Sequence, residues 1–378
     1  MFSYWEQQSF SYYDHIVIGS GIVGLSLAIE LTEREPGKRL LVLERGLLPT
    51  GASTRNAGFA CMGSATELLD DLLYMTEAEV LGLFELRKKG LSLLRKRLGD
   101  DTIGYKANGS YELISEKETD ALDQLDRLNT MLLPVTGQPA FKQANEKIQE
   151  FGFAGPYAKA LIENTCEGEL HSGKMMRALT DLAISKGVEI KTGAAAQSFE
   201  ENTNEVTVNV KDPFRPDLWM LKCGTLSICT NAFTKLLLPD VDVTPGRGQV
   251  LITKPIPGLK FKGVYHFDKG YYYFRELDGR VLFGGGRNLD FAGETTTDFS
   301  LNNHIQADLE QKLKEVILSN TPFETDMRWA GIMAFGANKY PIVKAFSNRV
   351  FGAFRMGGMG VAMGSETARQ LAEIIAGK

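Results

Sequence analysis

The chain has 378 residues, of which 43% are hydrophobic and 24% charged, and its formal net charge is −5. This composition is ordinary for a globular protein and excludes disordered and fibrous architectures, and the length predicts two or three domains. The longest basic runs, at 87–89 and 95–97, indicate a solvated helix face, so we expect no nucleic-acid binding.

Targeting and metal signals are weak. No run of ~18 apolar residues occurs, and residues 1–6 lack the basic and apolar regions of a signal peptide. The four cysteines show no Cys-x-x-Cys spacing, which disfavours a zinc site and is typical of a reducing compartment. We therefore expect a cytoplasmic protein with no metal and no integral membrane association.

The first elements along the chain form a strand, a glycine turn, a helix and a second strand. An apolar run at 15–18 breaks at Gly19-Ser20-Gly21-Ile22-Val23-Gly24 and resumes with helical spacing at 25–31. The apolar run 40–43 follows and ends at Glu44. This order predicts a βαβ unit of about 30 residues that binds a dinucleotide.

Each glycine of the turn has its own expected role. Gly19 permits the tight turn, Gly21 lets the backbone approach a pyrophosphate, and Gly24 lets the helix pack closely on the strand. The helix N-terminus offers N–H groups and partial positive charge to the phosphates. Glu44 is placed to accept hydrogen bonds from the ribose hydroxyls, which disfavours a cofactor with a 2′-phosphate. The alternative is a packing turn followed by a surface glutamate.

Helical and strand patterns follow in turn. Leucines and other apolar residues at helical spacing predict helices over 65–98, 116–133 and 173–186, the last capped at Ser172. Alternating or apolar runs predict strands at 109–114, 205–210, 225–229 and 349–353, and several antiparallel strands between 245 and 290. The chain ends with a glycine turn at 357–360 and a helix over 361–375.

Two further glycine-rich loops carry a family resemblance. Gly51-Ala52-Ser53-Thr54-Arg55-Asn56-Ala57-Gly58 begins seven residues after Glu44, and residues 354–364 again open a helix. At these loops the sequence resembles the D-amino-acid oxidase (DAO) family of FAD-dependent oxidoreductases. The glycine oxidase, sarcosine oxidase and glutamylputrescine oxidase branches are the most similar. The resemblance extends from about residue 14 to residue 376.

The resemblance implies an α/β fold with a Rossmann-like FAD-binding domain and an interleaved α+β substrate domain built on an antiparallel sheet. The FAD-binding domain is expected from segments 12–64, 166–240 and 326–378. The substrate domain is expected from segments 65–165 and 241–325.

The family pattern also implies a set of cofactor-binding residues. The loop at 53–58 wraps the pyrophosphate beside the flavin, and residue 196 offers its backbone to the adenine. The last helix faces the flavin N1–C2 carbonyl, where negative charge collects on reduction. The residues expected to bind FAD are Gly19, Ser20, Gly21, Ile22, Val23, Gly24, Glu44, Arg45, Ser53, Thr54, Arg55, Asn56, Ala57, Gly58, Ala196, Gly357, Gly358, Met359, Gly360 and Val361.

The implied activity is oxidation of the CH–NH group of an amino acid or amine by hydride transfer to flavin N5. The implied partners are that small-molecule substrate and O2 or another electron acceptor. Two alternatives stay open: an FAD-dependent 2-hydroxy-acid or glycerol-phosphate-type dehydrogenase, and a flavin-binding subunit that does not turn over.

Three departures from the family pattern concern the substrate and the flavin. Met333 stands where glycine-oxidase-like members carry a carboxylate-binding arginine. Residues 332–335 contain no cysteine of the kind that attaches flavin in sarcosine-oxidase-like members, which predicts non-covalent FAD. Residues 281–283 contain no lysine to activate oxygen, which leaves a dehydrogenase with another acceptor open.

The catalytic residues are not predicted by type, because the cofactor performs the chemistry. Tyr271 and Tyr273 fall on one face of a predicted strand and could close the substrate pocket. The full set of candidates for the pocket is Tyr271, Tyr273, Arg287, His266 and Met333, with Arg55 and Arg275 as other possible carboxylate anchors. Their alternative roles are an aromatic core, a structural histidine, and surface or phosphate-side arginines.

Aromatic residues also gather at the start of the chain, among them Tyr4, Trp5, Phe10 and Tyr12. They could contact a membrane surface or a partner, but we expect them to pack on the cofactor-binding domain.

Overall fold

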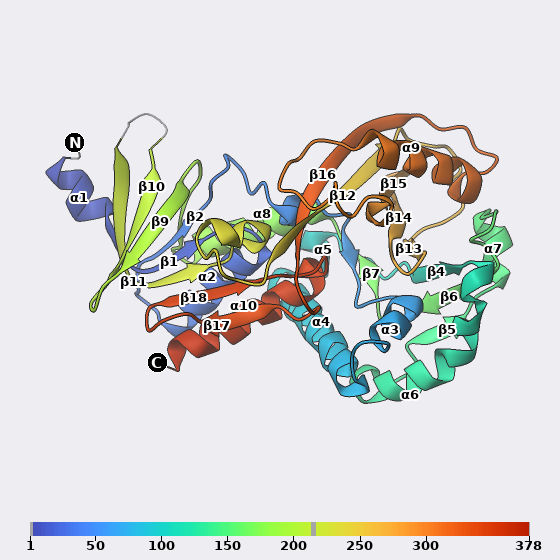
Figure 1. The fold of residues 1–378 in the computed structure, drawn as a ribbon, viewed down its shortest axis with the longest axis horizontal. Coiled ribbons are helices and arrows are strands. Elements are labelled where there is room, and N and C mark those ends of the chain that lie inside the picture. Colours follow the sequence, from blue (N-terminus) through green and yellow to red (C-terminus); the bar gives the residue numbers. More distant parts are fainter. Residues whose placement is uncertain (1–2, 213–216, 378) are drawn as a thin grey trace.

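The computed structural model describes residues 3–212 and 217–377. The molecule has two lobes, each built around one sheet, and both ends of the chain lie at the first lobe (Figure 1). Because segments from the beginning, middle and end of the chain form the first sheet, the lobes are interleaved along the sequence.

The first sheet has the strand order β17-β18-β11-β1-β2-β8, and β10 and β9 extend it from β11. Strands β18, β11, β1, β2 and β8 are parallel, as in nucleotide-binding α/β folds. The strands are β1 Tyr12–Ile18, β2 Leu40–Leu43, β8 Glu189–Lys191, β9 Ala195–Glu201, β10 Val206–Lys211, β11 Leu218–Ile228, β17 Ile342–Ala345 and β18 Val350–Phe354.

Helices α2 (Ile22–Arg34) and α10 (Gly360–Ala376) pack on this sheet, and α4 (Glu77–Leu98) packs on α10. Glycines permit the close packing of these helices on one another. A Cβ on Gly364 would lie 2.8 Å from Ile22 Cγ2, and one on Gly90 would lie 2.2 Å from the Ala362 carbonyl oxygen. The N-terminal ends of α2 and α10 are thereby fixed near one another.

The second sheet has the order β16-β12-β15-β14-β13-β4-β6-β5, antiparallel except for the pair β13 and β4. One face carries an aromatic core, in which Tyr265 and Phe274 stack 4.6 Å apart. Because side chains alternate along a strand, His266 and Tyr273 point to the other face. The strands are β4 Ser110–Ile114, β5 Phe141–Gln143, β6 Ala160–Asn164, β12 Thr244–Thr253, β13 Val264–Phe267, β14 Tyr272–Leu277, β15 Arg280–Gly285 and β16 Thr325–Phe335.

Shorter elements complete the fold, and its mixed α/β architecture confirms the expected class. The short strands β3 (Phe59–Ala60) and β7 (Gly168–Glu169) pair with each other. The remaining helices are α1 Tyr4–Phe10, α3 Ala65–Asp71, α5 Asp100–Ile103, α6 Leu125–Thr136, α7 Glu146–Phe151, α8 Ser172–Ser185 and α9 Asn303–Lys312.

Two long helices predicted from the sequence are interrupted. The segment 65–98 forms α3 and α4 separately, because Thr76 and Glu79 form a capping box that starts α4. The segment 116–133 begins with 3₁₀ turns over Glu116–Gln124 and continues as α6.

The helix predicted over 173–186 begins one residue earlier than expected, and so does its N-terminal cap. Helix α8 begins at Ser172, and its cap is His171, whose Nδ1 accepts a hydrogen bond from the Lys174 N–H (3.2 Å). The Ser172 hydroxyl is engaged elsewhere, since it donates to Asn56 Oδ1 (2.7 Å).

Three segments differ from their expected surroundings. Strand β16 lies at the edge of the second sheet, although the segment 326–378 was assigned to the cofactor-binding domain. Arg87, expected on a solvated face, is buried and donates to the Met62 carbonyl oxygen. The N-terminal aromatics do not pack inward: Trp5 on α1 is 74% exposed.

Candidate active site

One cavity of about 740 Å³ is lined by residues of both sheets. Its nucleotide end is formed by the glycine turn after β1, the end of β2, the loop 51–58 and the start of α10. Its substrate end is formed by β12 to β16 and the segments that follow β15 and β16. Of the predicted cofactor-binding residues, all but Gly24, Thr54 and Gly58 line it.

The turn after β1 has the geometry predicted for its glycines. Gly19 has φ +106°, a conformation that side chains rarely adopt. A Cβ on Gly24 would lie 1.8 Å from the Gly19 carbonyl oxygen, so the absence of a side chain at Gly24 lets the helix pack closely on the turn. Helix α2 begins just after Gly21, which has no side chain to cap it.

Glu44 is buried at the end of β2, with its carboxylate held by donors. Its Oε2 accepts hydrogen bonds from the Ser20 hydroxyl (2.6 Å) and the Ser20 N–H (3.3 Å), and its Oε1 accepts one from the Gly46 N–H (2.9 Å). A carboxylate has about four acceptor sites, so Glu44 retains capacity for a hydroxyl. Next to it, the Arg45 guanidinium stacks 3.6 Å from the Phe233 ring centroid.

The loop 51–58 is fixed by its own side chains. Ser53 Oγ accepts a hydrogen bond from the Ile22 N–H (3.0 Å), which holds the loop at the start of α2. Thr54 faces away from the cavity and donates to the Pro49 carbonyl oxygen (2.6 Å). Asn56 Oδ1 accepts from the Gly58 N–H (2.9 Å), and a Cβ on Gly58 would collide with the Leu170 carbonyl oxygen at 2.3 Å.

The second glycine turn leads into α10. Gly357 and Gly358 have φ +54° and +86°, and no side chain caps the helix that begins at Gly360. A Cβ on Gly358 would lie 3.3 Å from Met333 Sδ, so this turn forms the boundary with the substrate end. The turn is held by Arg355, whose Nε and Nη2 donate to the Tyr340 carbonyl oxygen (3.0 and 2.8 Å).

These features fit a dinucleotide that carries a redox ring. Two helix N-termini without side-chain caps of their own line the same cavity. A buried carboxylate at the end of β2 has acceptor capacity for ribose hydroxyls. A Cβ on Gly357 would meet no atom within 4 Å, which leaves open space at the turn where a ring would approach.

The five residues predicted for the substrate pocket, His266, Tyr271, Tyr273, Arg287 and Met333, all line the cavity. His266 lies on β13, Tyr273 on β14 and Met333 on β16. Tyr271 directly precedes β14, and Arg287 follows β15. Burial lowers the pKa of His266 to about 4, against the nearby charge of Glu67, and raises the pKa of Tyr273 to about 12. His266 is therefore neutral at pH 7.

Arg287 lies between two aromatic rings, with its Cζ 4.4 Å from the Phe335 ring centroid and 5.1 Å from that of Phe291. Gly246 makes room for it, since a Cβ there would lie 3.0 Å from Arg287 Cζ. Among the described residues Arg287 has no ion-pair partner, and its Nε is buried without a hydrogen bond. Burial lowers its pKa, but arginine stays charged at any physiological pH.

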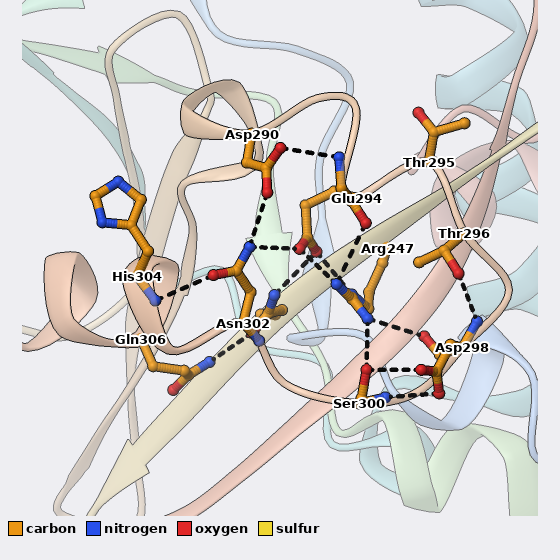
Figure 2. Close-up of polar contacts among 12 residues, drawn as sticks. Arg247, Asp290, Glu294, Thr295, Thr296, Asp298, Ser300, Asn302, His304 and Gln306 are labelled. Atoms are coloured by element: carbon orange, nitrogen blue, oxygen red, sulfur yellow. Dashed lines mark hydrogen bonds and ion pairs between the residues drawn. The ribbon is translucent and has the colours of Figure 1, made fainter.

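The segment that carries Arg287 is fastened to β12 by a buried ion pair (Figure 2). Arg247 Nε and Nη2 donate to the two carboxylate oxygens of Glu294 (2.8 and 2.7 Å). Gln249 and Asn302 donate to the same carboxylate (2.9 and 3.2 Å). The pair ties the segment between Gly286 and Asn302, which includes Arg287, to β12.

The other two candidate arginines already have partners. Arg275 Nη1 donates to the Leu170 and Gly58 carbonyl oxygens (2.7 and 3.1 Å), and its Nη2 lies 3.4 Å from Glu169. Arg55 lines the cavity, but its Nε and Nη1 donate to the Thr50 and Ala330 carbonyl oxygens (3.1 and 3.0 Å). Their interactions are structural.

Sequence reasoning missed several cavity residues. Lys339 lies in the cavity wall, with its Nζ 3.0 Å from Glu67 Oε1 and 2.5 Å from Asp71 Oδ1. Lys269 pairs in the same way with Asp70 (2.7 Å). No local signal marks these residues, because α3, the turn between β13 and β14 and the segment after β16 are far apart in sequence and meet only in the fold.

The described residues contain neither a membrane-spanning helix nor a cluster of metal ligands. No helix there is both long and apolar enough to cross a bilayer. No group of three or more His, Cys, Asp or Glu side chains in the same part of the chain is arranged to hold a metal ion.

Comparisons with known proteins agree with this geometry. The probable oxidoreductase OrdL of Haemophilus influenzae is 22% identical over 384 residues, which covers 96% of this chain and 83% of that protein. Mitochondrial L-2-hydroxyglutarate dehydrogenase of Bos taurus is 22% identical over 340 residues, which covers 82% of this chain and 69% of that protein.

Among solved structures, L-proline dehydrogenase from P. horikoshii and glycine oxidase from Geobacillus kaustophilus share the fold, each with a TM-score of 0.77 and 19% identity. The matches cover 97% of this chain and 94% and 95% of theirs. The family model for FAD-dependent oxidoreductases, DAO, matches residues 14–374. The chain is therefore an oxidoreductase that belongs to the DAO family.

Proposed function

We propose that the protein binds FAD non-covalently and oxidises the CH–NH group of an amino acid whose carboxylate binds to Arg287. When bound, FAD supplies the redox chemistry by accepting a hydride at N5 from the substrate carbon. The residues of this chain hold the cofactor, orient the substrate and exclude water. The remaining substrate-end candidates, Tyr271, Tyr273, His266 and Met333, surround the reacting carbon.

The observation that carries the proposal is the charge of Arg287 in the cavity wall, which has no ion-pair partner within residues 3–212 and 217–377. The two other cations of the substrate end, Lys269 and Lys339, are neutralised by Asp70 and by Glu67 and Asp71. A guanidinium fork matches a carboxylate in two parallel hydrogen bonds. Arg287 is half-buried and its Nε has no partner among the described residues, so an anionic substrate group would offset the cost of desolvating its charge.

Non-covalent attachment is supported by the chemistry around the cavity. Cys61 lines the cavity beside the second glycine turn, where its thiol donates to Met359 Sδ (3.7 Å). Burial raises the pKa of Cys61 well above its ordinary value, so the thiol stays protonated and is a poor nucleophile. We expect acid precipitation to release the flavin into solution, and flavin retained in the pellet would contradict this part of the proposal.

A 2-hydroxy acid is the second candidate substrate, favoured by the similarity to L-2-hydroxyglutarate dehydrogenase. It carries the same carboxylate, so Arg287 serves both classes. Anaerobic bleaching of the flavin separates them: we expect amino acids to bleach it and simple amines without a carboxylate to fail. Bleaching by 2-hydroxy acids alone selects the second candidate, and bleaching by no compound in a broad panel indicates a non-catalytic flavin subunit.

The role of Arg287 is tested by binding without turnover. An aromatic carboxylate that enters the cavity should shift the flavin absorption spectrum, and its Kd should rise roughly 30-fold in Arg287→Met, from the loss of about 2 kcal/mol of charged hydrogen bonds. Arg287→Lys should recover only part of the affinity, because an ammonium lacks the fork. Lys269→Met is the matched control and should bind as the wild type does. Equal affinity in Arg287→Met would place the carboxylate elsewhere.

A further inference from the structure

A second, much smaller pocket lies behind the substrate end of the cavity, and His266 lines both. Its volume is about 10 Å³, close to the space that one water needs. Polar side chains form part of its wall, namely Ser64, Ser110, Glu112, Asn164, Glu167 and His266, and the rest of the wall is Ala65, Tyr111, Phe141 and Ile162. A void of this size is just large enough for one water, and the polar groups in its wall could hold that water by hydrogen bonds.

The strand register places the two pockets on one line. Tyr273 on β14 pairs with His266 on β13, and His266 pairs with Glu112 on β4. Register partners share a face of the sheet and lie about 5 Å apart. Tyr273 and His266 line the main cavity, and His266 and Glu112 line the small pocket. This row of side chains therefore runs from the main cavity into the interior of the second lobe.

His266 has an unused hydrogen-bonding atom. The side chain is 6% exposed, and its Nε2 is buried without a partner among the described residues. A buried imidazole nitrogen without a partner costs about 1–3 kcal/mol. A water in the small pocket or a substrate in the main cavity would supply the missing bond.

Two buried carboxyl groups face the small pocket. Glu112 accepts hydrogen bonds from the Ser64 hydroxyl (2.8 Å), the Thr66 hydroxyl and the Thr66 N–H (3.2 Å). Glu167 accepts from the Met62 and Gly63 N–H groups (2.5 and 2.8 Å) and the Ser110 hydroxyl (2.7 Å).

The donors distinguish the two groups as proton acceptors. A hydroxyl can turn and accept a hydrogen bond, whereas a backbone N–H cannot. Glu112 is held mainly by hydroxyls and Glu167 mainly by N–H groups, so Glu112 is the one that can become a neutral acid without losing its partners.

We propose that His266 is a proton-transfer residue: it takes the proton that the substrate nitrogen loses and passes it, through one water in the small pocket, to the carboxylate of Glu112. The inference rests on the proposed function. In the balanced step, the C–H electron pair leaves the substrate as hydride to FAD, the N–H proton ends on Glu112, and the substrate becomes an imine. Glu112 changes from a carboxylate to a neutral carboxylic acid.

The charges around His266 are consistent with proton transfer from the substrate toward Glu112. Glu67 on α3 lies near His266 and is itself neutralised by Lys339 and by Arg87, whose Nη2 is 3.8 Å away. Burial raises the pKa of Glu112 to about 7, against its hydrogen bonds from Thr66 and Ser64, and burial likewise raises that of Glu167 to about 7. The neutral imidazole of His266 thus lies between the substrate and acids that can hold a proton near pH 7.

The test compares three variants of the FAD-loaded protein. In the wild type, the rate constant of anaerobic flavin reduction by a saturating amino acid should rise with pH around pH 7, as Glu112 ionises. Glu112→Gln should lose this dependence, and His266→Ala should be slower by about 10²-fold or more and be rescued by added imidazole. Glu167→Gln is the matched control and should keep the dependence. A wild-type pH profile in Glu112→Gln, or a wild-type rate in His266→Ala, would overturn the proposal.

A measurement without substrate separates this inference from the proposed function. Infrared spectra of the yellow, substrate-free protein should show a protonated carboxyl band that titrates near pH 7 and is diminished in Glu112→Gln. Glu112 titrating near its ordinary 4.5 would refute the relay even if amino acids reduce the flavin. If the band titrates near pH 7 but no amino acid bleaches the flavin, the proposed function fails, and the proton transfer proposed here fails with it.

Discussion

The two ends of the cavity are built differently. At the nucleotide end, backbone groups and helix N-termini face the cavity, and the key carboxylate, Glu44, is held by three donors. At the substrate end, side chains from several strands face the cavity, and two of them, Arg287 and His266, keep buried nitrogen atoms without partners among the described residues. The nucleotide end thus presents mainly backbone groups to a ligand, whereas the substrate end presents side chains with unpartnered atoms.

The first prediction breaks the nucleotide end. Gly24→Ala places a methyl group 1.8 Å from the Gly19 carbonyl oxygen, so the turn and α2 must separate. We expect loss of FAD binding and several kcal/mol of stability. Gly37→Ala is the matched control, because a Cβ there meets no atom within 4 Å. Its φ of +88° should cost about 1 kcal/mol and leave the protein yellow. Flavin absorbance measures FAD binding and thermal unfolding measures stability in both variants. A Gly24→Ala protein that is still yellow would contradict the prediction.

The second prediction loosens the substrate end alone. Glu294→Gln leaves the buried Arg247 guanidinium without its counter-ion and frees the segment that carries Arg287. Removing one partner of a buried pair costs about 3–5 kcal/mol. We expect lower stability and weaker carboxylate binding, with FAD still bound. Urea unfolding and the flavin spectral titration measure the two effects. Unchanged carboxylate affinity would show that the ion pair does not position Arg287.

This difference also decided what the sequence could predict. The nucleotide end depends on residues close in the chain, so the spacing from Gly19 to Glu44 was sufficient to predict its turn, helix and acid. The substrate end depends on pairings between distant segments. Arg287, Tyr273 and His266 were predicted as members of the pocket, but the partners that distinguish Arg287 from Arg55 and Arg275 were not.

Local hydrogen bonding explains the smaller errors. Ser172 was predicted as a cap because serine caps helices by default, but its hydroxyl binds Asn56, more than a hundred residues away. Lys339 and Glu67 were missed because neither has a motif. Their significance comes from an ion pair at 3.0 Å between α3 and the segment after β16.

The third prediction concerns stability against pH at the substrate end. The folded-state pKa of Glu112 is about 7 and its ordinary value is 4.5, so the folded protein binds more protons than the unfolded chain between these values. The contribution of Glu112 to stability is therefore present below pH 4.5 and is lost as pH rises to 7. The Glu112→Gln variant has no carboxyl group to titrate at this position, so this pH dependence is absent from its stability. The free energy of unfolding of the variant, relative to that of the wild type, should therefore increase by about 2 kcal/mol between pH 5 and 7.5. Urea unfolding at both pH values measures the change, and a constant difference contradicts it.

The smallest expected effect tests whether Glu44 contacts the ribose or only shapes the turn. Glu44→Gln keeps an acceptor for Ser20 but loses the charge and part of the hydrogen-bonding capacity. We expect FAD to bind roughly tenfold more weakly, a loss of about 1.4 kcal/mol. FMN lacks the adenosine ribose, so its affinity for the apoprotein should be the same in Glu44→Gln and in the wild type. Equal weakening of FAD and FMN would show that Glu44 acts through Ser20 and Gly46, and the nucleotide end would then depend on its backbone alone.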